Sequence, residues 1–267
     1  MSIQALYTAC TGMNSMQNKL DVIANNLANA ETTAFKADRP NFEDLFYRQE
    51  KFPGAQDSSG AYTPTGIAIG TGSRLQSTQS NNIQGSLQQT GNPLDIAIQG
   101  QGYFQIKDPS GTILYSRAGN FSQNASGQIV MGSANIGRLL EPTITIPQDA
   151  MNISVSAAGV VTYTTSTSPS TPQQAGTIQL ANFINPQGLL KIGENLYQET
   201  DASGTAQTGV PGANGMGTTQ QNSLEQSNVD PVTSLIDLIT TQRAFEMNSQ
   251  TIQAGNQCWQ TINNLIK

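Results

Sequence analysis

Apolar residues near the N-terminus recur at heptad spacing. One set is seven residues apart and a second follows each member by three positions; the sets are Leu6, Met13, Leu20 and Leu27, and Ala9, Met16, Ile23 and Ala30. This a/d pattern is typical of a coiled-coil helix. It predicts a helix from about residue 3 to 30, roughly 40 Å long at about 1.5 Å per residue.

The C-terminal region repeats the same period. The seam residues are Leu238, Phe245, Ile252, Trp259 and Ile266, and Leu235, Ile262 and Leu265 widen the stripe. Asp230 followed by Pro231 is a helix start signal, with Asp as the N-cap and Pro at the first helical position. The pattern therefore predicts a second long helix that begins at Pro231.

Short apolar or alternating runs separated by turn residues fill the middle of the chain. The runs that predict strands are LDIAIQG, GYFQIK, TILYSR, GQIVM, TITIP, NISVS, VVTYTTS, GTIQLANF and NLYQET. The sequences DPSG and NASG predict tight turns. TSPSTP predicts a surface loop, and the Gly- and Thr-rich residues 201–223 predict an extended connection.

These patterns predict an α+β fold in which long terminal helices flank a mainly β central domain. The expected divisions are 1–30 (N-terminal coiled-coil helix), 31–66 (linker or extended hairpin), 67–209 (β-rich domain), 210–228 (linker) and 229–267 (C-terminal coiled-coil helix). Each helix stripe is too apolar to face water alone. We expect the helices to pair as an antiparallel coiled coil, although another subunit is an alternative companion for each.

Composition excludes several classes of function. Only 11% of residues are charged, the net charge is −6, and the chain has no histidine. An acidic chain is a poor nucleic-acid partner, and the lack of histidine removes histidine-based catalysis and metal sites. No apolar run has the length of a membrane span or of a signal peptide core. We expect no cofactor and no small-molecule substrate.

Local motifs for catalysis or redox chemistry are weak. GQGYFQI and GANGMG lack the strand-to-helix context of a phosphate-binding loop. Asp95, Glu141, Asp149 and Glu194 are candidates for a glycosidase pair, but turn or solvated carboxylates fit them better. Cys10 and Cys258 each lie nine positions from a terminus. Two small semi-buried residues are the favoured interpretation, with a disulfide as the alternative.

Three amides stand out at the end of the first helix. The stretch ANNLANAETTAFK carries Asn25, Asn26 and Asn29, and Asn is a mediocre helix former. One interpretation is a frayed helix end with solvated amides. The other is that the amides bond to the backbone of an adjacent chain and fix the register of an apolar seam. The residues alone leave both open.

Four stretches resemble the bacterial flagellar rod and hook axial protein family. They are ANNLANAETTAFK, LQQTGNPLDIAIQGQGYFQI, YSRAGNF and SNVDPVTSLIDLITTQRAFEMNSQTIQ, in the family's order. Residues 52–74 resemble the extra segment that sets distal rod subunits apart. The family usually has Gly where this chain has Ala34, which suggests that this position does not need a left-handed backbone.

The resemblance implies a structural subunit, not an enzyme, in a rigid hollow periplasmic shaft that transmits torque from motor to hook. It implies export by the flagellar type III system without a cleaved signal peptide, with the terminal helices around the export channel. The implied partners are other copies of the chain, proximal rod and hook subunits, ring proteins and the export apparatus. Residues implied in assembly through the family motifs are Asn25, Asn26, Asn29, Thr33, Phe35, Asn228, Asp230, Pro231 and Arg243.

Three rival functions remain from the sequence. A proximal rod or hook subunit of the same family is the nearest, and the segment at 46–74 argues against it. A peptidoglycan-cleaving enzyme would need a carboxylate pair that the sequence does not reveal. A secreted carbohydrate-binding β module would have no use for the heptad ends.

Overall fold

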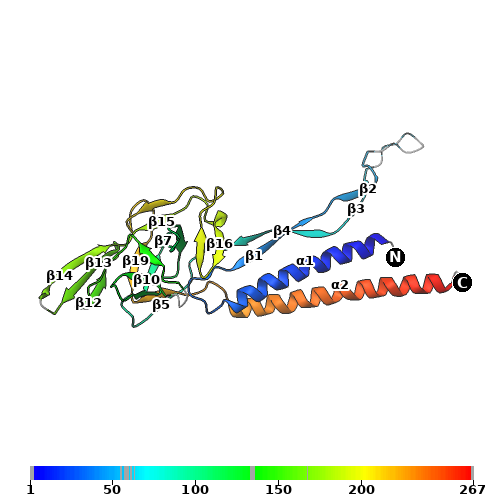
Figure 1. Ribbon diagram of the computed structural model, residues 1–267. Helices are drawn as coiled ribbons and strands as arrows, with labels where there is room; N and C mark the ends of the chain where they lie inside the picture. The colour runs from blue at the N-terminus through cyan, green and yellow to red at the C-terminus, as the bar shows by residue number, and fades with distance from the viewer. Residues whose placement is uncertain are drawn as a thin grey trace. The chain divides into compact units, whose positions relative to one another are not determined.

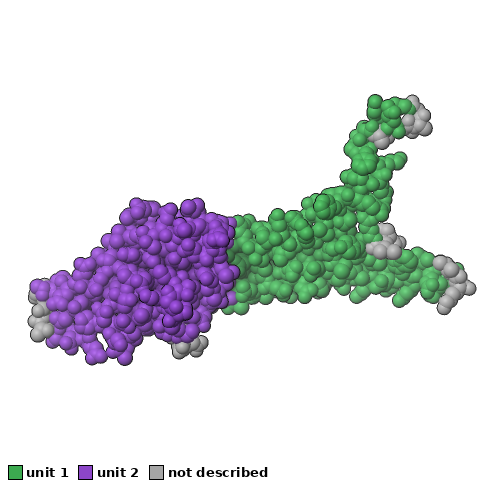
Figure 2. Space-filling model, turned by 45° about the horizontal axis from the view of Figure 1, so that its top comes forward, with its two compact units in different colours: residues 1–28, 38–80, 230–267 green, residues 29–37, 81–229 purple. Residues whose placement is uncertain are grey.

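The computed structural model describes residues 3–54, 56, 60, 62, 64–132, 136–166 and 168–265. It has a mainly β central region with one long helix near each end, as the sequence predicts (Figure 1). The chain forms two compact units (Figure 2). Unit 1 comprises residues 1–28, 38–80 and 230–267, and unit 2 comprises residues 29–37 and 81–229.

Unit 1 contains both helices. They are α1 (Ile3–Ala28) and α2 (Pro231–Leu265), and they contact each other. The predicted start of the second helix is confirmed, because Asp230 Oδ1 accepts the backbone N–H of Val232 at 3.0 Å. This bond satisfies one of the amides that a helix N-terminus leaves without a partner.

A narrow β ribbon completes unit 1. Its strands are β1 (Asp38–Asp44), β2 (Tyr47–Lys51), β3 (Ile67–Gly70) and β4 (Ser73–Ser80), with β1 paired to β4 and β2 paired to β3, both antiparallel. Strands β1 and β4 pack on α1. At Gly72, where φ is +117°, an added Cβ would lie 1.9 Å from Thr11 Oγ1, so only glycine fits this approach to α1. Residues 67–80 therefore belong with the helices, whereas the sequence assigned them to the β-rich domain.

The largest sheet of unit 2 has nine strands. Along its main path the order is β16 (Leu190–Gly193), β17 (Leu196–Gln198), β8 (Ile113–Ser116), β7 (Tyr103–Lys107), β11 (Leu139–Glu141), β10 (Ile129–Met131) and β9 (Phe121–Gln123). Strand β15 (Leu180–Asn182) also pairs with β7, and β18 (Gln207–Gly209) pairs with β15. The two predicted turns close hairpins here: Gly111 N–H donates to Asp108 O, and Gly127 N–H donates to Asn124 O.

Smaller sheets complete unit 2. They are β12 (Ala150–Val155) with β13 (Val160–Thr165) and β14 (Ser168–Thr177), β6 (Ile96–Gln99) with β19 (Thr218–Gln221), and β5 (Leu87–Gln89) with β20 (Ser223–Glu225). A short 3-10 helix, η1 (Pro186–Gly188), precedes β16. Residues 168–172 were expected to be a loop and lie in β14. Residues 210–228 were expected to be a linker and carry β19 and β20, because these polar strands form by pairing with β6 and β5 and show no apolar pattern of their own.

The core of unit 2 follows the alternation of its strands. Buried side chains on one face of the sheet include Phe104, Ile106, Leu114, Leu140 and Leu196, and Ile96 and Ile98 of β6 join the same cluster. The opposite face carries a second cluster of Tyr103, Tyr115, Phe183 and Tyr197 in edge-to-face contact. Two-sided burial explains why these strands read as nearly continuous apolar runs.

The second cluster makes unit 2 sensitive to alkaline pH. Burial raises the pKa of Tyr115 to about 12, with a further contribution from Glu199, whose carboxylate accepts the phenol hydrogen bond at 3.2 Å. An unfolded tyrosine has a pKa of about 10. The folded state therefore binds the proton more tightly, and this contribution to stability is complete below about pH 10 and is lost as the pH rises towards 12.

We expect the free energy of unfolding of unit 2 to fall between pH 10 and 12, and Tyr115→Phe to lose less over this range. The measurement is denaturant unfolding at several pH values, followed through the near-UV signal. Tyr163→Phe in β13 is the control and should follow the wild-type curve. Equal losses in wild type and Tyr115→Phe would contradict the assignment to Tyr115.

Candidate functional site

The predicted seam residues of α1 face inward. Ala9 and Ile23 are buried, and the others are half-buried; these are Leu6, Met13, Met16, Leu20 and Leu27. A Cβ built on Gly12 would lie 3.2 Å from Asn248 Nδ2 of α2, so the two helix surfaces touch there. Ser15 is also buried, and its hydroxyl donates to Ser73 O of β4 at 3.1 Å. Both α2 and the β ribbon therefore cover α1.

The seam of α2 is only partly covered. Leu238, Phe245 and Ile252 are half-buried, whereas Trp259 and Ile262 are each 43% exposed, and Ile266 lies outside the described residues. The fully buried positions of α2 are Thr241 and Gly255, which the apolar pattern did not reveal. They occupy the second heptad position, where small side chains permit close approach of two helices.

A second apolar stripe on α2 is uncovered. Its members, spaced as on one face of a helix, are 47–65% exposed in this chain; they are Val232, Leu235, Ile236 and Ile239. We call these four residues the α2 stripe. Large apolar side chains exposed over two helical turns mark a surface for another protein.

Asn26 makes the specific backbone contact that the sequence left open. Its Nδ2 donates to Asp38 O at 2.8 Å, and its Oδ1 accepts Asp38 N–H at 2.9 Å. The side chain is buried, so the amide is not solvated. Asn26 thereby fixes the first residue of β1 against the end of α1, within one chain.

Asn228 makes the equivalent contact in unit 2. Its Oδ1 accepts Ala37 N–H at 2.8 Å, and its Nδ2 donates to Asn81 O at 2.8 Å and to Ile83 O at 3.0 Å. Thus two side-chain amides hold the consecutive backbone amides of residues 37 and 38. One precedes α2 and the other lies near the end of α1.

The remaining motif residues have separate environments. Asn29 Oδ1 accepts the hydroxyl of Thr32, Phe35 lies under the ammonium of Lys191 at 5.3 Å, and Thr33 is half-buried. Asn25 and Asp230 are exposed, and Pro231 opens α2. Arg243 is exposed and pairs with Glu246 one turn away at 3.1 Å.

Ala34 corrects one expectation. The sequence suggested that this position needs no left-handed backbone, yet Ala34 has φ = +56° and is buried. Its N–H donates to Glu225 O at 2.8 Å, which holds the turn in place. The methyl group packs into the core of unit 2, and this packing offsets the cost of the left-handed conformation.

Three charged side chains meet in the interior of unit 2. Lys36 Nζ lies 2.6 Å from Glu225 Oε1, and Arg117 Nε lies 2.6 Å from Glu225 Oε2. All three are buried, with Glu225 and Lys36 each 1% exposed. We call these residues the Glu225 network. It joins the first and third of the sequence motifs to Glu225, which lies two residues before the last motif begins.

Backbone groups complete the Glu225 network. Lys36 Nζ donates to Ile83 O at 2.8 Å, Arg117 donates to Gly102 O at 3.0 Å and to Gly100 O at 2.5 Å, and Gly85 N–H donates to Glu225 Oε1 at 3.0 Å. Burial lowers the pKa of Lys36, and the adjacent Glu225 carboxylate opposes that shift. The network holds two cations and one carboxylate, so Glu225 is essential to its charge balance.

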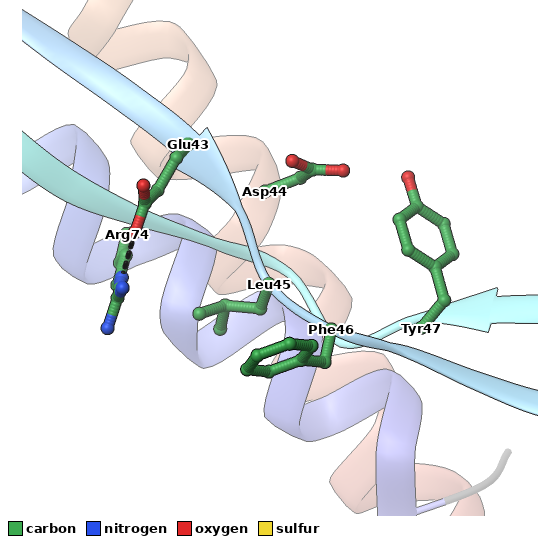
Figure 3. A pocket seen from close by; sticks show the side chains of 6 residues that line it. All are labelled: Glu43, Asp44, Leu45, Phe46, Tyr47 and Arg74. Atoms are coloured by element: carbon green, nitrogen blue, oxygen red, sulfur yellow. Dashed lines mark hydrogen bonds and ion pairs between the residues drawn. The ribbon is translucent and has the colours of Figure 1, made fainter.

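The bend of the β ribbon forms a groove in unit 1. A space of about 490 Å³ is lined by Glu43, Asp44, Leu45, Phe46, Tyr47 and Arg74 (Figure 3). Phe46 is 93% exposed, and Arg74 pairs with Glu43 at the rim. Beyond the bend, Tyr47, Phe52, Tyr62 and Ile67 are also exposed.

Three of the four carboxylates considered for catalysis have structural partners, and the fourth, Asp149, is exposed. Asp95 accepts the hydroxyl of Thr90 at 2.7 Å and the amide of Asn92 at 3.0 Å. Glu194 pairs with Arg138, and Glu141 lies 4.0 Å from Lys107. These contacts fit turn and surface roles.

Other chemistry is equally sparse among the residues that the structure describes. No group of three or more Cys, Asp or Glu side chains could hold a metal ion there. Cys10 and Cys258 are free and exposed, not semi-buried as expected. No described helix is long and apolar enough to cross a membrane.

Comparison with known proteins agrees with this geometry. Three family models match: the flagella basal body rod protein model at residues 6–36, the flagellar hook protein FlgE/F/G D1 domain at 97–163, and the flagellar basal body rod FlgEFG protein C-terminal model at 220–265. The flagellar basal-body rod protein FlgG of Caulobacter vibrioides is 46% identical over 98% of this chain and 99% of its own length. The chain belongs to the FlgG family of flagellar basal-body rod proteins.

Other FlgG relatives extend the match across bacteria. FlgG of Agrobacterium fabrum is 41% identical over 99% of this chain and all of its own length, and FlgG of Bacillus subtilis is 36% identical over 98% and 99%. Each of these relatives is named a flagellar basal-body rod protein. The three matched segments contain the seam of α1, strands β7 to β11 of the nine-stranded sheet and α2, so family membership rests on both units.

We expect Asn26→Ala to destabilise unit 1 by about 2–3 kcal/mol, because it removes the two hydrogen bonds between the buried Asn26 amide and the backbone of Asp38. Unit 2 should keep its stability. Amide hydrogen exchange of α1, β1 and the sheet of unit 2 measures both. Asn14→Ala, at an exposed position of α1, is the control, and equal protection in the two variants would contradict the role of Asn26.

Ala34 offers a test of backbone strain. Ala34→Gly removes a left-handed penalty of about 1–2 kcal/mol, but it loses a buried methyl worth about 0.8 kcal/mol and gains unfolded-state entropy. The net change should stay within about 1 kcal/mol. Ala34→Val places a β-branched residue in the left-handed region and should cost more than about 2 kcal/mol. Thermal unfolding compares the two, and equal effects would contradict the assignment.

Proposed function

We propose that this structural subunit of the flagellar distal rod polymerises helically with copies of itself into a rigid hollow shaft. The shaft would transmit torque from motor to hook and enclose the protein export channel. Subunits of the proximal rod and the hook would bind at its ends. The shaft would lie in the periplasm, surrounded by ring proteins, and each chain would be exported by the flagellar type III system.

The terminal helices would form the inner layer as an antiparallel coiled coil. Three observations support this arrangement: α1 and α2 contact each other, the heptad residues of α1 and those of α2 up to Ile252 are buried or half-buried, and the ribbons run in opposite directions (Figure 1). With Gly12 opposite Asn248, Cys10 lies opposite residue 250 of α2. That position is about 12 Å along the helix from Cys258, which is too far for a disulfide within one chain.

The α2 stripe would be the contact between copies. Covering Ile236 and its neighbours removes apolar area from water, worth about 1.5–3 kcal/mol for each large side chain. A contact between two different faces of the same molecule does not close on itself, so repetition gives a helical filament. The uncovered stripe is the single observation that carries the proposal, because a monomer has no use for it.

The β2–β3 hairpin would brace neighbouring copies. A two-stranded hairpin is at best marginally stable alone in water. Strand β2 is exposed along its whole length, and the hairpin presents Phe52 and Ile67 to solvent. Docking on another copy would cover these side chains and stiffen the shaft.

Electron microscopy of the purified full-length chain tests the proposal. We expect tubes from the wild-type chain and an at least about tenfold higher critical concentration for Ile236→Asp, because a charge would replace a buried apolar contact. Far-UV circular dichroism should stay unchanged, since Ile236 is exposed in the single chain.

Gln250→Asp is the matched control, because it introduces the same charge at an exposed polar position of α2. It should form tubes at the wild-type concentration. Tubes from Ile236→Asp at that concentration would show that copies meet through another surface. A wild-type chain that stays monomeric at every concentration would contradict unaided self-assembly.

A further inference from the structure

The residues of the Glu225 network come from distant parts of the chain. Lys36 belongs to residues 29–37, the short first segment of unit 2, and Arg117 belongs to the second segment, residues 81–229. Glu225 is among the last residues of the unit, five positions before the residue that caps α2. In the described structure, Glu225 is the only carboxylate bonded to both cations. Of the three side chains of the network, it is the last to be synthesised or delivered.

Strand pairing shows the same dependence on the end of unit 2. Within the described residues, β6 pairs only with β19 and β5 pairs only with β20. Strand β6 supplies Ile96 and Ile98, which are fully buried in the core. Before residues 218–225 join, β5 and β6 have no strand partner in the described structure.

The cations are positioned without Glu225. Lys36 Nζ is held by Ile83 O, and the Arg117 guanidinium by Gly100 O and Gly102 O. A carbonyl oxygen accepts a hydrogen bond but carries no net charge, so it does not neutralise either cation. Two like charges in a water-excluded site are costly until an anion separates them.

We propose that Glu225 is the closing residue of unit 2, whose arrival neutralises Lys36 and Arg117 and lets β19 and β20 pair with β6 and β5. An incomplete chain would keep unit 2 open, and a chain that has fully emerged would close it. The idea that late closing helps a subunit that is delivered as an extended chain rests on the proposed function. The closing step itself is a property of the isolated chain.

A charge-dependent closing step differs from ordinary packing in one respect. If Glu225 only fills space, the amide of glutamine, which has the same shape, replaces it at small cost. If its charge closes the unit, Glu225→Gln leaves two buried cations facing each other. Removing one cation as well should then restore part of the lost amide protection, whereas a packing role predicts a further loss of protection.

The test is amide hydrogen exchange on the full-length chain at pH 7. We expect Glu225→Gln to lower the protection of β5, β6, β19 and β20 at least about 100-fold, while α1 and α2 change little. Glu141→Gln is the control, since Glu141 is a partly exposed carboxylate of the same unit, 4.0 Å from Lys107. It should leave protection within a few-fold of wild type.

Two further measurements separate the effect of the Glu225 charge from the effect of its packing. The double variant Lys36→Met/Glu225→Gln should regain at least about tenfold of the lost protection. The Glu225→Gln deficit should also shrink between pH 7 and 9.5, because burial lowers the pKa of Lys36 and the ammonium loses its proton early. The charged or titratable groups around Lys36 are Glu225, Arg117, Tyr103 and Lys191; burial raises the pKa of Tyr103, so that phenol stays neutral in this range.

Wild-type protection in Glu225→Gln, or a double variant less protected than the single one, would overturn the proposal. A deficit that does not change with pH would overturn it as well. None of these outcomes depends on tube formation. Failure of the closing step and failure of the polymerisation proposal are therefore separate results.

Discussion

A single buried carboxylate organises the β unit. The Glu225 carboxylate pairs with Lys36 Nζ, from the segment after α1, and with Arg117 Nε, from the middle of the chain. Each nitrogen lies 2.6 Å from a carboxylate oxygen. Removing three charged groups from water costs free energy. Their mutual attraction offsets this cost only when all three are present. The interaction therefore favours this arrangement of distant segments over other compact arrangements. It contributes less to the overall free energy of unfolding. The same segment carries β19 and β20, so charge and strand pairing depend on the same residues.

The two units have different roles in an axial protein. Unit 2 has an extensive apolar core, and both units leave some large apolar side chains exposed; in unit 1 these lie on α2 and on the β ribbon. Asn26 bonds to the backbone of Asp38 within unit 1, and Asn228 bonds to the backbone of Ala37 within unit 2. An assembly subunit needs this combination: a fixed body, and uncovered surfaces that other copies can bury.

The elements with strong periodicity could be predicted from the sequence. Heptads gave both helices, Asp230 and Pro231 gave the start of α2, and apolar runs gave most strands of the large sheet. The motif resemblance gave the family. Strands β19 and β20 could not be predicted, because their polar residues become strand only by pairing with β6 and β5. Thr241, Gly255 and the left-handed Ala34 were also missed, since close approach and positive φ depend on tertiary contacts. Glu225 resembles any surface glutamate until its partners are known.

A cryo-electron microscopy map of the tube, at a resolution that separates helices, tests the central claim most directly. That claim is that copies join through the terminal helices while each β unit closes on its own chain. The account predicts that α1 and α2 of every copy surround the lumen, with the α2 stripe buried against another copy and Glu225 bonded to Lys36 of the same chain. A tube joined through unit 2 with the α2 stripe facing solvent would contradict it.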